Sequence, residues 1–128
     1  MINSKFILNI LDLLLDGDQE GILARPQINF LTVKEQIFTG PGTFIFFLHD
    51  EKIIKYKVND SDFNISGVVI NSPDLKIGAD AHIFLKNGII NYLEIYSRDS
   101  SYPKHELKEY IITQEWVGSP NRKIVSTK

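Results

Sequence analysis

The feature that most constrains the fold is the dipeptide Asn87-Gly88, which stands between two runs of mostly apolar residues. Asn-Gly is the favoured pair for a two-residue type I′ turn, because both turn positions need a positive φ. The flanking residues 79–86 and 89–96 are therefore expected to form a β-hairpin. A two-residue turn predicts that Leu85 pairs with Ile90 and that Ile83 pairs with Tyr92.

This register divides the expected hairpin into two faces, because side chains alternate along a strand. One face is expected to carry Ile83, Leu85, Ile90, Tyr92 and Glu94, and the other His82, Phe84, Leu93 and Ile95. Both faces are partly apolar, which is typical of strands that have neighbours on both sides. We therefore expect this hairpin to lie near the centre of a sheet.

The N-terminal residues have the three-and-four spacing of an amphipathic helix. Apolar side chains recur at Phe6, Ile7, Ile10, Leu11, Leu14 and Leu15. Asn3 or Ser4 can cap the start of such a helix, and Gly17 can end it. The pattern predicts a helix over about residues 4–16, whose apolar side must pack on another element because short helices are marginal alone.

Turn residues divide the rest of the chain into further strand candidates, at 36–39, 43–49, 52–58, 63–71 and 107–116. Residues 21–33 are ambiguous: Arg25-Pro26 interrupts a helix, and a short extended piece is expected near 28–33. Gly118-Ser119-Pro120 is expected to end regular pairing, which would leave 118–128 as a loosely held tail.

These elements predict a single α+β domain over residues 1–128. The N-terminal helix would pack on a largely antiparallel, meander-like sheet of about five to seven strands, spanning about 36–117. The chain is 43% hydrophobic and 23% charged, which is typical of a soluble domain that can bury a core. The apolar stretch 6–15 is too short for a membrane span of roughly 20 residues, and a cytoplasmic protein is the expectation.

Composition also excludes several function classes. The chain has no cysteine, which rules out disulfides, thiolate metal sites and cysteine nucleophiles. Its net charge of −2 does not resemble the basic surface of a nucleic-acid binder. His49, His82 and His105 are isolated from one another, so no metal site is predicted. We expect no catalytic residue, no cofactor and no metal.

Glu94 is the acid with the most interesting context, within the run Tyr92-Leu93-Glu94-Ile95-Tyr96. A half-buried carboxylate on a strand can act as a general acid or base. The alternative is structural: Glu94 pairs with Arg98 or Lys86, or lies at the sheet surface between tyrosines. We favour the structural interpretation, because no nucleophile or second acid is identifiable beside it.

Surface acids suggest a charged contact region. Four of them gather around the end of the first helix: Asp12, Asp16, Asp18 and Glu20. Acids at an interface can speed the capture of a basic partner, although solubility alone also explains them. A second candidate contact region is the loop 98–105, where Arg98, Asp99 and His105 are polar and Tyr102 is an aromatic candidate anchor.

The hairpin and the loop after it resemble a recurrent pattern in small, uncharacterised bacterial proteins. The shared features are here Gly78-Ala79, Asn87-Gly88, Leu93-Glu94, Tyr96 and Tyr102-Pro103, over roughly residues 37–103. Small proteins of this type are similar to the immunity proteins encoded beside polymorphic toxins, including those of contact-dependent growth inhibition. The resemblance implies a toxin domain as partner and carries over no catalytic residue.

We therefore expect a non-enzymatic binding protein, an immunity protein that neutralises a cognate bacterial toxin by occlusion. A nuclease toxin would have a basic cleft that an acidic surface could fill, with no direct contact to nucleic acid or membrane. One alternative is a small enzyme or ligand-binding domain, with a pocket under the sheet around Glu94, Tyr92, Tyr96 and His82. Another is a structural subunit or homo-oligomer joined through a strand edge.

Overall fold

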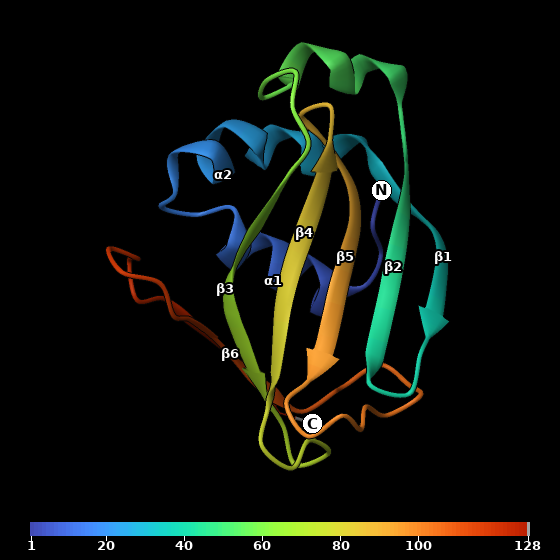
Figure 1. Cartoon of the computed structure of the whole chain (residues 1–128), viewed down its shortest axis with the longest axis vertical. Coiled ribbons are helices and arrows are strands. Elements are labelled where there is room, and N and C mark those ends of the chain that lie inside the picture. Colours follow the sequence, from blue (N-terminus) through green and yellow to red (C-terminus); the bar gives the residue numbers. More distant parts are fainter. Residues whose placement is uncertain (128) are drawn as a thin grey trace.

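Alternating apolar residues build a seven-stranded antiparallel sheet, with α1 packed against one of its faces (Figure 1). The computed structural model describes residues 1–127. The strands are β1 Leu31–Phe38, β2 Gly42–His49, β3 Phe63–Asn71, β4 Ala79–Lys86, β5 Ile89–Ser97, β6 Tyr110–Gln114 and β7 Lys123–Ser126. The predicted α+β class with a largely antiparallel sheet is confirmed.

The spatial order of the strands is β1-β2-β5-β4-β3-β6-β7. Neighbours in sequence pair within three groups, β1-β2, β3-β4-β5 and β6-β7. The groups join where β2 pairs with β5 and where β3 pairs with β6, and every pairing is antiparallel. The predicted hairpin, β4-β5, lies at the centre of the sheet as expected.

The turn of this hairpin forms at Asn87-Gly88, and both residues have a positive φ, of 53° and 75°. The backbone of Gly88 lies against Asn59, so that a Cβ at this position would stand 2.1 Å from the Asn59 carbonyl oxygen. The side chain of buried Gln27 holds the same turn: it donates to the Gly88 carbonyl and accepts from the Ile90 N–H. The turn is therefore fixed from two sides.

A β-bulge changes the register immediately beyond the turn. Leu85 pairs with Ile90 as predicted, but Phe84 then pairs with Tyr92, and one residue of β5 is left over. The prediction that Ile83 pairs with Tyr92 is therefore wrong, since Ile83 pairs with Leu93. The predicted faces are corrected accordingly: the core side carries Ile83, Leu85, Ile90, Leu93 and Ile95, and the other side His82, Phe84, Tyr92 and Glu94.

Helix α1 spans Lys5–Leu14, inside the predicted 4–16. Ser4 caps it, because its hydroxyl accepts a hydrogen bond from the Ile7 N–H at 3.1 Å. The apolar side of α1 is buried against β3, β4 and β6, as the spacing predicted. Within the described residues, no helix has the length and apolar character needed to cross a membrane.

The ambiguous segment after α1 is helical until the first strand begins. Helix α2 spans Gln19–Ala24 and the 3-10 helix η1 spans Arg25–Phe30, with Pro26 near its start. The extended piece expected near 28–33 therefore begins only at Leu31, where β1 starts. The sheet consequently begins earlier than the expected residue 36.

The predicted strand at 52–58 is wrong. Residues Glu51–Tyr56 form a 3-10 helix, η2, which Asp50 starts by accepting from the Lys52 N–H. The alternation of lysines with apolar residues resembled a strand, but Ile53 alone is buried in this segment. The cap at Asp50 and the single buried anchor favour a tight helical turn instead.

The predicted loose tail is also wrong for most of its length. Strand β7 pairs with β6 along its whole length, which extends the sheet to Ser126 instead of about 117. Gly118 and Asn121 adopt positive φ values, of 86° and 57°, and reverse the chain between the two strands. Strand β6 is shorter than the expected 107–116. Lys128, the last residue of the predicted tail, lies outside the described residues.

Candidate functional site

The sheet has one covered face and one open face. The covered face packs against α1, and its side chains, such as Ile45, Ile83 and Leu93, are buried. The open face consists of the alternate side chains of the same strands, and these are half-buried or exposed in β2 and β5. In Figure 1, α1 crosses behind the strands and the open face is turned toward the reader. The open face is where a partner or ligand has direct access to the sheet.

Four aromatic rings form a cluster on the open face, from β2, β4 and β5. The ring of Tyr92 is central: its centroid lies 5.6 Å from that of Phe44, 5.7 Å from Phe46 and 5.2 Å from Phe84. All four side chains are half-buried, because they cover one another. The bulge in β5 brings Tyr92 to this side, so the register prediction missed the cluster. We call these four residues the aromatic cluster.

Exposed apolar side chains extend the aromatic cluster on β1 and β2. Ile37, 44% exposed, lies beside Phe44 in the strand register, and Leu48, 53% exposed, is two residues beyond Phe46 on β2. Side chains two apart on a strand share a face. The cluster and these two aliphatic side chains therefore make one apolar surface across four strands, β1, β2, β5 and β4.

Glu94 faces the open side, next to this cluster. Its cross-strand partner is His82, and the distance from His82 Nε2 to Glu94 Oε1 is 3.1 Å. The structure thus pairs Glu94 with a histidine, not with Arg98 or Lys86. The ring of Tyr96 lies edge-on to that of His82, with centroids 6.0 Å apart. This pair lies on the open face and not under the sheet, where the core is packed.

Arg98 and Asp99 of the loop 98–105 are engaged in local contacts. Arg98 donates through Nε and Nη2 to both carboxylate oxygens of Asp80, each at 3.0 Å. This bidentate contact with Asp80 raises the pKa of Arg98. The hydroxyl of Ser97 donates to Asp99 and lowers the pKa of that carboxyl. The Arg98–Asp80 pair supplies charge beside the open face.

Tyr102 is not a surface anchor. Its side chain is 6% exposed and belongs to the core, and burial raises the pKa of Tyr102 well above its ordinary value. The prediction that Tyr102 is an exposed anchor rested on the polar residues around it. It was wrong because the composition of a loop does not show which of its side chains turn toward the core. His105 is exposed, and its ring nitrogen Nδ1 lies 3.1 Å from the Glu106 carbonyl oxygen.

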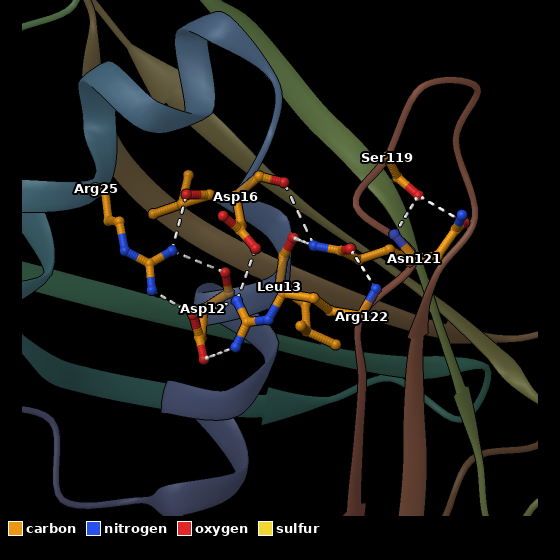
Figure 2. Close-up of polar contacts among 9 residues, drawn as sticks. Asp12, Leu13, Asp16, Arg25, Ser119, Asn121 and Arg122 are labelled. Carbon is orange, nitrogen blue, oxygen red and sulfur yellow. Dashed lines mark hydrogen bonds and ion pairs between the residues drawn. The ribbon is translucent and has the colours of Figure 1, made fainter.

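Two of the four clustered acids are already bound by arginines (Figure 2). Asp12 forms ion pairs with both Arg25 and Arg122, and Asp16 lies 2.7 Å from Arg122 Nη1. The hydrogen bond from Arg122 lowers the pKa of Asp12, and the same contacts raise the pKa of Arg122. Asp18 and Glu20 are exposed. The expected acidic contact region therefore carries less free negative charge than its sequence indicates.

The same region satisfies the C-terminal end of α1. The Gln114 amide donates to the carbonyls of Leu13 and Asp16, at 3.0 and 3.3 Å. Arg25 Nη1 donates to the carbonyls of Asp12 and Leu15. These side chains replace the partners that a helix end lacks. Their role is structural, and it ties strand β6 and η1 to α1.

The part of the chain that the structure describes contains no group of three or more histidine, aspartate or glutamate side chains placed to hold a metal ion. Comparison with protein-family models, with curated proteins and with solved structures gives no match. The open face with its aromatic cluster is therefore the candidate site, on the grounds of its geometry alone.

Proposed function

We propose that this chain is a non-enzymatic protein-binding protein that uses the open face of its sheet. In its specific form, the proposal is that of an immunity protein, which neutralises a cognate bacterial toxin domain by covering its active site or substrate cleft. The observation that carries the proposal is the aromatic cluster on the open face, extended by exposed Ile37 and Leu48.

Apolar surface of this kind is costly to leave in water, and contiguous patches often mark interaction sites. Aromatic side chains are enriched at the centres of protein interfaces, where they bury much area with few rotatable bonds. Charged groups belong at the rim, and here the Asp80–Arg98 pair lies on the same face as the cluster. This arrangement suits a protein surface as the partner.

Occlusion requires a rigid surface and no chemistry from the inhibitor. The open face is built on the central strands β2, β5 and β4, whose other side is packed into the core. Such a surface loses little conformational entropy on binding. The exposed acids Asp18 and Glu20 would also attract a toxin with a basic cleft. Salt would weaken this long-range attraction.

The test is to measure binding between the purified protein and the product of the toxin gene next to its own. Ile37→Glu and Leu48→Glu place a charge within the apolar surface, at positions exposed enough to keep the fold. We expect each to weaken binding by about tenfold or more, which is typical of interface centres. Each should also reduce the protection of cells that express the toxin.

The matched control is Val117→Glu, which adds the same charge at a fully exposed position after β6. It should leave affinity and protection unchanged. A complex that forms with equal affinity in all three variants would place the contact elsewhere than the open face. An absence of binding and of protection with the unaltered protein would overturn the immunity proposal itself.

A further inference from the structure

A groove of about 290 Å³ lies at one end of the molecule, apart from the open face. It is formed where α2 and the start of η1 meet η2, the green helical segment at the top of Figure 1. Its lining consists of Ile22, Leu23, Pro26, Lys55, Tyr56, Lys57 and Val58. Two segments about thirty positions apart thus build one concave surface.

The lining is unusually apolar for an exposed surface. Ile22 and Leu23 are each more than half exposed, because α2 turns Gly21 and Ala24 inward instead. Tyr56 is 38% exposed and stacks on Phe30, with ring centroids 5.5 Å apart, which fixes its ring beside the groove. Ile54 adds a further exposed apolar side chain on η2. Such a gathering is typical of an interaction surface.

Positive charge borders this apolar lining. Lys57 lies 2.8 Å from the carboxylate of Asp60, whose side chain is 91% exposed. The border therefore already binds one carboxylate from this chain. Lys55 is exposed and, among the described residues, has no carboxylate within ion-pair distance. Its ammonium group is available for a second carboxylate.

We infer that this groove binds an acidic, amphipathic segment of a partner protein. An apolar side chain of the segment would enter between Leu23 and Tyr56, and a neighbouring carboxylate would meet Lys55. The groove is at the small end of the volumes that hold whole ligands, about 300–1,000 Å³, so it suits a side chain. Exposed Glu20 and Glu51 lie on the same helical segments and disfavour a uniformly anionic membrane. This surface is separate from the open face and does not depend on the function proposed above.

The test is an NMR titration of the full chain with two pools of synthetic octapeptides. The acidic pool alternates aspartate or glutamate with leucine, isoleucine or phenylalanine, and the basic pool has lysine at the acidic positions. We expect saturable amide shifts around Leu23 and Tyr56 with the acidic pool, at a dissociation constant below about 1 mM. Lys55→Glu should weaken this binding by about two- to fivefold, as expected for an exposed ion pair. Leu23→Ser should weaken it by about tenfold.

The matched control is Lys76→Glu, which reverses an exposed lysine outside the groove and should leave the titration unchanged. Equal shifts with the basic pool, shifts centred elsewhere, or no saturable shift with the acidic pool would each overturn the inference. Vesicles of equal parts phosphatidylglycerol and phosphatidylcholine provide a further arm. If the protein binds these vesicles and Leu23→Ser abolishes that binding, the inferred ligand is wrong and the groove binds a lipid surface instead.

Discussion

The guanidinium group of Arg122 lies 3.0 Å from the carboxylate of Asp12, measured from Nη2 to Oδ2. The two residues are 110 positions apart, so this contact joins the last strands of the sheet to the first helix. The same guanidinium group reaches Asp16, and Asp12 also receives Arg25 (Figure 2). The C-terminal hairpin is therefore attached to the core by charge as well as by pairing with β3.

Replacement of Arg122 by methionine should loosen β7 while keeping most of the side-chain volume. We expect the free energy of unfolding to fall by about 1 kcal/mol, since partly exposed ion pairs contribute little individually. Hydrogen exchange of the Ile124 amide, which faces Ile112 of β6 in the ladder, should become faster. Urea denaturation and exchange measurements provide the two readings. Lys123→Met is the control, with a change expected below about 0.5 kcal/mol.

Acid should weaken the same attachment. The pKa of Asp12 is lower in the folded protein than in the unfolded chain, so its stabilising effect is complete above the unfolded pKa of about 4. The effect is lost as the pH falls through the lower, folded pKa. Urea midpoints between about pH 2 and pH 6 should therefore decline more steeply in the unaltered protein than in Asp12→Asn. Parallel pH profiles for the two proteins would contradict the role of Asp12.

Gln27 should be among the most sensitive polar positions. It is fully buried, donates to the Tyr56 and Gly88 carbonyls and accepts from the Ile90 N–H. Gln27→Leu would remove the partner of the Tyr56 carbonyl and of the Ile90 N–H, at about 1–3 kcal/mol each, whereas the Gly88 carbonyl would keep its hydrogen bond from the Val58 N–H. We expect a loss of about 3 kcal/mol or more in urea denaturation. The exposed Gln19→Leu should change stability by less than about 0.5 kcal/mol, and a similar loss there would contradict this assignment.

A comparison of Gly88 with Gly118 distinguishes the cost of a positive φ from the cost of a steric clash with a neighbouring segment. Gly88 and Gly118 both have a positive φ, but a Cβ would meet Asn59 at the first and open space at the second. Gly118→Ala should cost about 1 kcal/mol, which is the backbone term alone. Gly88→Ala should cost clearly more, because backbone atoms stand 2.1 Å from the added Cβ. Equal losses in thermal or urea unfolding would show that the turn moves freely away from Asn59.

Local patterns predicted the elements whose signals are local. The Asn87-Gly88 turn, the cap at Ser4 and the apolar spacing of α1 each depend on a few neighbouring residues. The bulge in β5 could not be predicted, because it is decided by which face the core needs and not by the turn. The helical turn η2 was missed for a similar reason: alternation fits a strand, whereas burial of Ile53 alone fits a turn.

The candidate site was harder to predict than the fold. Pairing of Asp12 with Arg122 and burial of Tyr102 both depend on segments that are distant in sequence. The sequence predicted that Phe44 and Phe46 lie on a strand. It could not show that their side chains lie on the open face, because that depends on which face of the sheet α1 covers. The prediction correctly placed Glu94 on a central strand. The contact between Glu94 and His82 could not be predicted, because the bulge brings the two side chains to the same face.

The single extra residue in β5 has a consequence for how this protein can change over evolutionary time. Loss of Asn91 would restore an unbroken register in which Tyr92 still lies opposite Phe84 and Leu93 still lies opposite Ile83, so each face of the strand would keep its residues. A deletion of one codon at this position would thus remove a local bend from a central strand without exchanging its buried and exposed side chains. Closure of the bulge with Asn91 retained would instead pair Ile83 with Tyr92 and turn Tyr92 and Glu94 into the core, so the open face depends on the bulge for as long as Asn91 is present.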